Sequence, residues 1–127
     1  MKQMGKFAVI LLAGCALGAG VVQGLHAQAG KAPAYAIAEV EVTDPPEYQV
    51  YLSKVIDSLK PYNAHIIVRA KPDLKEGAPV QGNIVITSFD SLADAEKWYN
   101  TPPYKDLIAE RQKSAKTRFY IVEGVPQ

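Results

Sequence analysis

Hydrophobic and polar positions alternate along several short stretches of the chain. Residues 35–42 read YAIAEVEV, in which one side is built from Ala and Val and the other side mixes polar and apolar residues. A period of two is typical of a β-strand that covers a core with one face. Further strands are predicted at residues 65–70, 84–89 and 117–123, and the first of these three is largely apolar on both faces.

A helical period follows the first predicted strand. Apolar residues recur at steps of three and four from residue 48 to residue 59, which gives one apolar stripe. Asp44 stands where an N-cap is needed, two prolines after it suit the first turn, and Glu47 completes a capping box. Pro61 ends the predicted helix.

A second helical pattern is interrupted. It begins after the N-cap residue Ser91 and runs through Trp98. It must stop at Pro102 and Pro103, because proline donates no backbone hydrogen bond and restricts the residue before it. Thr101 is placed to cap a restart, so the pattern predicts two helical segments with a bend between them.

The order of these elements predicts the fold class. The succession β-α-β-β-α-β indicates an α+β, ferredoxin-like domain with a four-stranded antiparallel sheet and its helices on one face. Residues 71–82 are too few for a helical crossover, so the strands on either side of them pair antiparallel. Since the strand at 65–70 is apolar on both faces, we expect the helix-free face to be buried against a second copy of the chain, in a homodimer.

The first 29 residues form a separate segment. Lys2 and Lys6 precede an uncharged apolar run that ends at Ala27-Gln28-Ala29, the order found in a secretory signal peptide. We therefore expect export to the periplasm or outside the cell. The predicted divisions are a signal peptide at residues 1–29, a linker at 30–33 and a ferredoxin-like domain at 34–127.

Two alternatives keep the chain at a membrane. Leu12-Ala13-Gly14-Cys15 is similar to a lipoprotein processing site, in which Cys15 would carry the lipid. Residues 7–25 form an apolar stretch of about 19 residues, close to the roughly 20 that span a bilayer, so an uncleaved helix would also hold the chain. With neither of these, no membrane association is expected.

Composition excludes several classes of function. The 127-residue chain is 48% hydrophobic and 21% charged with a net charge of +1, and its basic residues are scattered among acids, so nucleic acid is not an expected partner. The only cysteine is Cys15, and the domain holds one histidine, His65, so no metal site is predicted. No phosphate-binding loop or known catalytic motif is present, and no cofactor is predicted.

Charged residues on the predicted strands are the first candidate site. By strand alternation we expect Glu39, His65, Arg69 and Arg118 to point into one cavity suited to an acidic or phenolic ligand. His65 and Arg69 are the candidate catalytic residues, with His65 as a general base. The alternative is that Glu39 and Arg69 form a simple ion pair, or lie at a wet rim, and that His65 is a packed or surface residue.

The bend between the helical segments is the second candidate site. A kinked helix can leave a pocket between helix and sheet, in which Trp98 and Tyr104 form the wall and Arg111 binds an anion or carboxylate. The alternative is that the aromatic residues pack as core and that Arg111 forms an ion pair with Glu76 or another acid.

Several short motifs together resemble a known family. They are the strand YAIAEVEV before Asp44, Val68-Arg69, Glu76-Gly77, the WY-x-x-P-x-Y pattern of Trp98, Tyr99, Pro102 and Tyr104, Arg111, and Val122-Glu123-Gly124. The sequence is similar over nearly the whole domain to the bacterial family called domain of unknown function 1330 (DUF1330). It departs from the family pattern at Asn63-Ala64, where two glycines are usual, and at Ser88, where an acid is common.

The resemblance implies a dimeric α+β barrel, in which two ferredoxin-like subunits join their sheets. That superfamily includes cofactor-independent monooxygenases, haem-degrading monooxygenases and lactone isomerases, so the fold does not determine the function. Three hypotheses follow. The chain binds a small acidic or aromatic molecule in the barrel cavity; it is a cofactor-independent monooxygenase or isomerase-like enzyme; or it is a structural or interaction protein without a ligand.

Overall fold

The computed structural model describes residues 31–127. The predicted signal peptide, Cys15 and the alternative membrane helix lie outside the described residues. The elements, in chain order, are β1 (Ala34–Val42), α2 (Pro45–Leu59), the short 3₁₀ helix η1 (Lys60–Tyr62), β2 (His65–Ala70), β3 (Asn83–Phe89), α3 (Leu92–Asn100), α4 (Pro102–Ser114) and β4 (Ala115–Glu123).

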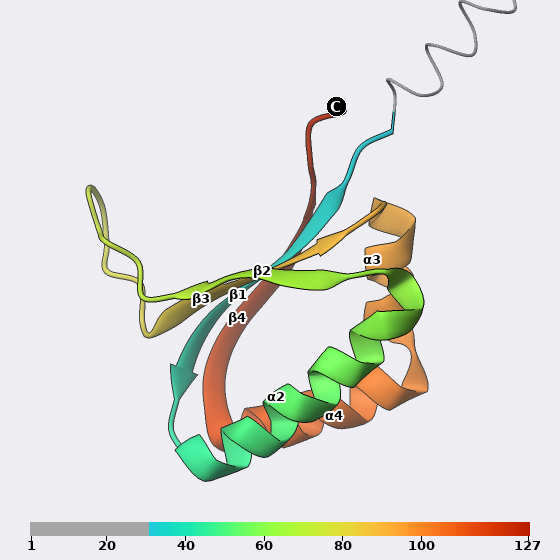
Figure 1. Cartoon of the computed structure of the whole chain (residues 1–127). Coiled ribbons are helices and arrows are strands. Elements are labelled where there is room, and N and C mark those ends of the chain that lie inside the picture. Colours follow the sequence, from blue (N-terminus) through green and yellow to red (C-terminus); the bar gives the residue numbers. More distant parts are fainter. Residues whose placement is uncertain (1–30) are drawn as a thin grey trace, which may run out of the picture. The chain divides into compact units, whose positions relative to one another are not determined.

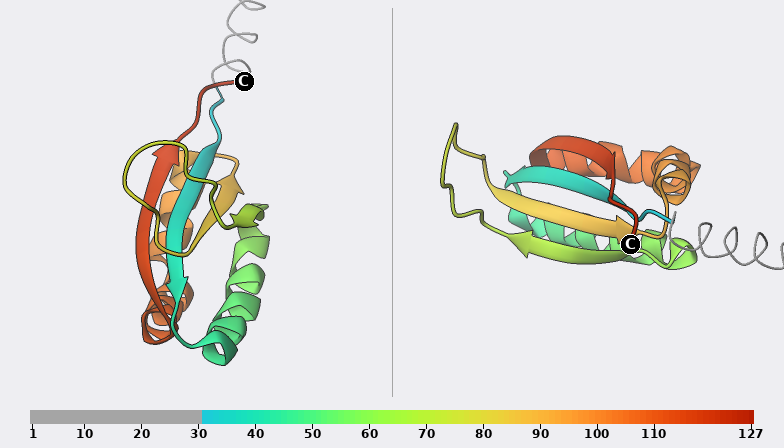
Figure 2. Two further views of the ribbon diagram at one scale, coloured as in Figure 1. Left: turned by 90° about the vertical axis from the view of Figure 1, so that its left-hand side faces the viewer. Right: turned by 90° about the horizontal axis from the view of Figure 1, so that it is seen from above.

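The four strands form one antiparallel sheet in the order β2-β3-β1-β4. The helices α2, α3 and α4 lie together on one face of this sheet, and the other face is left open (Figures 1 and 2). The long connection between β2 and β3 projects away from the helices (Figure 1). This arrangement confirms the ferredoxin-like order predicted from the pattern, including the antiparallel pairing across residues 71–82.

The alternation of β1 separates the two faces of the sheet. Ala36, Ala38 and Val40 are buried under the helices, whereas Ile37 and Glu39 lie on the open face. The alanines allow the helices to approach the sheet closely, because their side chains take little space. The core therefore lies in the single layer between the sheet and the helices.

A β-bulge interrupts the pairing of β2 with β3. Ile66 lies opposite Thr87 and Val68 lies opposite Ile86, so Ile67 is an extra residue without its own partner in the register. One extra residue shifts the alternation of everything that follows it. The prediction that two-residue spacing places His65 and Arg69 on one face is therefore wrong for these residues.

The predicted helix boundaries are confirmed, with one difference in capping. The Asp44 carboxylate accepts a hydrogen bond from the amide of Glu47 at 3.3 Å, and the Ser91 hydroxyl accepts one from the amide of Asp94 at 3.1 Å. Thr101 is extended at the break and precedes α4, but its hydroxyl donates to the carbonyl of Trp98 at 2.8 Å. Its side chain thus caps the end of α3 and makes no cap at the start of α4.

Three turns depend on the left-handed backbone region. Asn63 has a φ of 49°, a conformation that asparagine tolerates better than most residues, which explains how the usual glycine is replaced there. Gly77 has a φ of 90° in open space, and Gly82 has a φ of 76° where a Cβ would overlap the carbonyl of Val40.

Among the described residues, no helix is long and apolar enough to cross a membrane.

Candidate functional site

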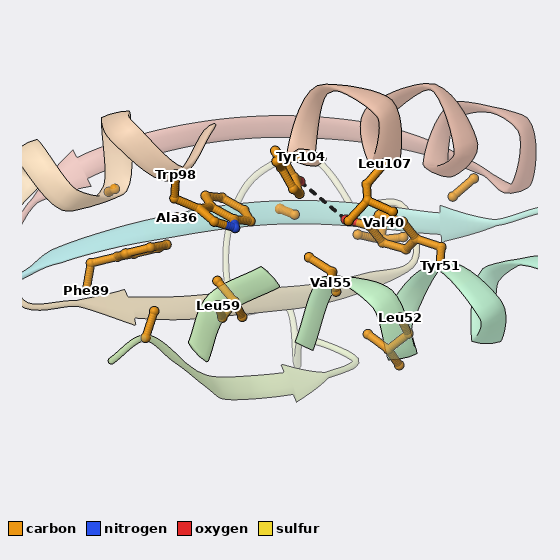
Figure 3. Close-up of a cluster of buried hydrophobic side chains, with 14 of the residues drawn as sticks. Ala36, Val40, Tyr51, Leu52, Val55, Leu59, Phe89, Trp98, Tyr104 and Leu107 are labelled. Carbon is orange, nitrogen blue, oxygen red and sulfur yellow. Dashed lines mark hydrogen bonds between the residues drawn. The ribbon is translucent and has the colours of Figure 1, made fainter. Parts of the chain in front are cut away.

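A polar cluster lies inside the core, between α2, α4 and the sheet. The guanidinium of Arg111 donates from Nη1 to the Tyr104 hydroxyl at 2.7 Å, and the Tyr104 hydroxyl lies 3.3 Å from the Tyr51 hydroxyl. Tyr51 extends from α2 and Tyr104 from α4, and the two side chains point toward one another across the layer (Figure 3). Three polar side chains from two helices thus form one hydrogen-bonded chain.

The proline break positions this cluster. Trp98 lies in the last turn of α3 and Tyr104 in the first turn of α4. The bend brings their rings together, with centroids 3.9 Å apart at 35°. Trp98 is held in turn by a hydrogen bond of 3.0 Å from its indole N–H to the Ser58 hydroxyl. Arg111 follows Tyr104 by seven residues, two helical turns, so both lie on the same side of α4.

Arg111 is a buried cation without a counterion. Its side chain is only 5% exposed, its Nε has no hydrogen-bond partner, and it forms no ion pair with any residue between 31 and 127. The guanidinium carbon lies 5.1 Å from the centre of the Phe119 ring, a cation–π contact. Removing such a charge from water costs several kcal/mol per ion, and the contacts that the guanidinium makes here are with phenol groups and one aromatic face.

The predicted partner of Arg111 is not found. Glu76 lies exposed in the connection between β2 and β3 and forms no ion pair with Arg111, so the interpretation of Arg111 as a tie to that acid is wrong. The aromatic half of the same alternative is confirmed, because Trp98 and Tyr104 are both core residues. The bend therefore provides core packing and a polar cluster at the same place.

Electrostatics keep the guanidinium of Arg111 charged and the phenol of Tyr104 neutral. Burial raises the pKa of Tyr104, Tyr51 adds to the effect, and Arg111 acts against it. Burial lowers the pKa of Arg111, but Tyr104 and Tyr51 act in the other direction and its pKa is raised overall. At neutral pH the cluster therefore presents a positive charge and one O–H donor that is not used within it.

A small cavity of about 30 Å³ adjoins the cluster. Tyr51, Tyr104 and Arg111 contribute to its wall. The rest of its lining is apolar or neutral, and comes from α2, α3 and the sheet: Ala36, Ala38, Val40, Tyr48, Leu52, Val55, Leu59, Ile66, Val85, Thr87, Trp98 and Phe119. A volume of this size admits a water molecule or the acid group of a larger molecule.

A larger groove lies at the outer edge of the sheet, where α2 passes β2. We call it the edge groove; it has a volume of about 510 Å³. Its lining is Ile56, Leu59, Ala64, His65, Ile66, Ile67, Val68 and Arg69. The predicted candidates His65 and Arg69 thus share a groove, although they point to different faces of the sheet. Arg69 lies opposite Val85, a residue of the helix-facing side, whereas His65 lies opposite Ser88 of the open face.

The open face holds the remaining candidates. Glu39 lies directly opposite Arg118, with 3.7 Å between Oε1 of Glu39 and Nη1 of Arg118. Its other oxygen accepts a hydrogen bond of 3.2 Å from the Tyr120 hydroxyl. The predicted pairing of Glu39 with Arg69 is wrong, because the bulge turns Arg69 to the helix side.

The structure thus divides the predicted site residues among three places. Trp98, Tyr104 and Arg111 meet in the core, Glu39 and Arg118 on the open face, and the two β2 residues in the edge groove. The sequence did not point to Tyr51, because a tyrosine in an apolar helical stripe is predicted to be a packed core residue. No group of three His, Cys, Asp or Glu residues suited to a metal ion occurs in the described part of the chain.

The comparisons with known proteins agree with this architecture. The profile of the family described as Domain of unknown function (DUF1330) matches residues 33–125. The chain belongs to the DUF1330 family. No curated protein matches it.

Solved structures similar to this DUF1330 chain share its fold. A protein of unknown function from Rhodopseudomonas palustris has a TM-score of 0.59 at 15% identity, over 85% of this chain and 92% of its own. A cofactor-independent oxygenase from Streptomyces nogalater, SnoaB, has a TM-score of 0.52 at 8% identity, over 72% and 91%. A dimeric ferredoxin-like protein of unknown function from Thermobifida fusca has a TM-score of 0.50 at 14% identity, over 75% and 92%.

Proposed function

We propose that the chain binds a small organic acid whose acid group pairs with Arg111. The observation that carries the proposal is a guanidinium 5% exposed, with an unpartnered Nε and no carboxylate partner, at the wall of a cavity. A buried cation of this kind is strongly stabilised by an anion that fits beside it. This ligand class is the acidic part of the class expected from the sequence.

The hydrogen-bond chain also favours an anion. Arginine can only donate, so the Tyr104 oxygen accepts from Arg111. One of the two phenolic protons is used in the hydrogen bond between Tyr51 and Tyr104, and the other remains to be donated. The cluster therefore holds more donors than acceptors. A carboxylate accepts hydrogen bonds and donates none, so it supplies the acceptors that the cluster lacks.

The site is better suited to binding than to catalysis. The residues that line the cavity include one charged group, Arg111, and no histidine or carboxylate that would act as a base. A cofactor-independent oxygenase is the second candidate, favoured by the fold shared with the Streptomyces nogalater oxygenase. It would require His65 as the base, and Leu59 and Ile66 lie between the edge groove that holds His65 and the cavity.

The same proposal includes a homodimer joined through the open face of the sheet. Tyr120 and Val122 on this face are 40% and 41% exposed, and Val68 on β2 is 36% exposed. A row of apolar residues across a sheet is typical of a surface that is covered in the assembled protein. The dimeric protein from Thermobifida fusca has the same fold, which supports a homodimer.

Calorimetric titration of the full chain tests the binding proposal. Butyrate and its neutral analogue butanamide are titrated into the wild type, Arg111→Met and, as a control that removes an exposed cation from α4, Lys105→Met. Butyrate is expected to bind the wild type and the control alike, and to lose at least about tenfold in affinity in Arg111→Met. Equal binding of butyrate and butanamide, or no loss in Arg111→Met, would contradict the proposal and favour a protein without a ligand at this place.

A further inference from the structure

The buried cavity and the edge groove are separated by only two shared side chains. Leu59 and Ile66 line both, and all other lining residues belong to one or the other. Leu59 is the last residue of α2 and Ile66 is the second residue of β2, so the partition stands where the helix layer meets the edge strand. Figure 2 shows β2 at the edge of the sheet, next to α2.

The size of the two spaces makes this juxtaposition important. The cavity at Arg111, about 30 Å³, takes the acid group of a ligand and little else. The edge groove, about 510 Å³, lies within the range of small-molecule sites. A ligand whose acid group reaches Arg111 therefore has to place its remaining atoms outside the cavity, and the partition leads to the groove.

The lining of the edge groove specifies the chemistry of those remaining atoms. Ile56 and Ile67 are 46% and 55% exposed there, and the bulge is what leaves Ile67 without a place in the regular register. Neither Asp nor Glu occurs among the lining residues, and Arg69 adds a positive charge. The groove is thus an apolar surface with Arg69 at its rim and Arg111 in the cavity behind it. Such a surface suits an apolar molecule that carries an acid group.

Arg69 and Arg111 are related through Tyr48. Both guanidiniums act to lower the pKa of the Tyr48 hydroxyl, which burial raises overall, so both lie within electrostatic reach of that hydroxyl. Tyr48 also lines the buried cavity. Positive charge thus extends from the edge of the sheet to the interior, in the direction that an acid group would take.

We propose that the edge groove and the buried cavity form one binding site for an amphipathic carboxylic acid, with the acid group at Arg111 and the apolar body in the groove. This inference rests on the proposed function and names the ligand class of the same site. Leu59 and Ile66 contact the ligand where it passes between the two spaces. Arg69, turned to the helix side by the bulge, attracts the anion from solvent.

A titration series with straight-chain acids tests the joined site. Butyrate, hexanoate and octanoate are titrated calorimetrically into the full chain. Because each buried methylene strengthens binding up to about fourfold, octanoate is expected to bind at least ~10-fold more tightly than butyrate even in a half-open groove. Ile67→Ser is expected to remove most of that gain, and so to weaken octanoate binding much more than butyrate binding. Val50→Ser, a change at a residue 45% exposed on α2 outside the groove lining, is expected to keep it.

The outcomes separate this inference from the proposed function. If butyrate binding depends on Arg111 but octanoate binds no more tightly, the joined site is wrong and the acid site stands. If octanoate binding survives Arg111→Met unchanged, the groove acts alone, as it would for an extended peptide added to the edge of β2, and the joined site is wrong. If the gain with chain length disappears as the protein concentration rises, a second copy covers the groove, and the inference is overturned.

Discussion

Replacement of Tyr104 by phenylalanine probes the buried cluster most sharply. The substitution keeps the ring that stacks on Trp98 at 3.9 Å and removes only the hydroxyl. That hydroxyl is the acceptor for Nη1 of Arg111 at 2.7 Å, and the residue is fully buried. Tyr104→Phe therefore removes the hydroxyl that accepts the 2.7 Å hydrogen bond of the buried guanidinium.

The expected loss can be estimated from that contact. A hydrogen bond to a charged group contributes about 1.5–3 kcal/mol, and an unsatisfied buried donor adds a desolvation penalty. We expect Tyr104→Phe to lower the free energy of unfolding by about 2–3 kcal/mol, a shift in Tm of roughly 10 °C or more for a domain of this size. The weaker contact to Tyr51, at 3.3 Å between neutral hydroxyls, contributes about 0.5–1 kcal/mol of this loss.

A double-mutant cycle with Arg111→Met separates the two contributions. Arg111→Met removes the buried charge together with its need for a partner, so it is expected to cost less than about 1 kcal/mol or to stabilise the chain. In that background Tyr104→Phe should cost only the neutral contact, which gives a coupling energy of about 1.5 kcal/mol.

Urea unfolding of the full chain at one protein concentration measures all four variants. Trp98 is the sole tryptophan and reports directly on the cluster. A loss below about 0.5 kcal/mol in Tyr104→Phe, or equal losses in the two backgrounds, would refute the description of Arg111 as a buried cation held by Tyr104.

Three further predictions concern other parts of the fold. Gly77→Ala should lower the free energy of unfolding by about 1 kcal/mol, because of its left-handed backbone alone. Gly82→Ala should cost at least ~2 kcal/mol more, because its Cβ would also overlap the backbone of Val40. Equal losses for the two variants in urea unfolding would contradict this. Burial raises the pKa of Tyr104, so on raising the pH the unfolded chain loses that phenolic proton before the folded chain does. The free energy of unfolding is therefore retained below about pH 10 and falls above it by up to ~1.4 kcal/mol per pH unit. Tyr104→Phe should flatten this slope. If the proposed dimer forms through the open face, Val122→Asp should convert it to a monomer in light scattering, while Val50→Asp on α2 should not. A dimer in both variants would exclude the open face as the interface.

Most of the fold could be predicted because the patterns are locally strong. β1 alternates along its length, and α2 and α3 begin at side chains that cap them as expected, although α4 does not. The break at Pro102 follows from the chemistry of proline itself. Helical spacing also brings Tyr104 and Arg111 together on α4, so the acid site was within reach of the sequence.

The bulge in β2 could not be predicted. The segment HIIVRA is apolar through its middle, so both faces are apolar whether or not the register shifts by one residue. The hydrophobic pattern therefore does not reveal the bulge. The placement of Arg69 on the helix side depends on pairing with β3, which is a tertiary contact. For the same reason the partner of Glu39 proved to be Arg118, its direct neighbour across the sheet, and not Arg69.

Tyr51 shows the other limit of sequence reasoning. Its position in an apolar stripe is consistent with packing, and its ring does pack against Tyr48 at 5.5 Å. Only the approach of α2 to α4 places its hydroxyl beside Tyr104. A polar group on an otherwise apolar face becomes informative once the opposite surface is known.

Fluorescence of Trp98 offers the most direct test of the central claim, that the cluster around Arg111 binds an acid. The indole ring lines the cavity and stacks on Tyr104, so an anion at Arg111 lies next to the fluorophore. Titration of the full chain with octanoate, and with octan-1-ol as the neutral analogue, should give a saturable change for the acid in the wild type that is absent in Arg111→Met. A change of the same size and midpoint in Arg111→Met, or with the alcohol, would contradict the account.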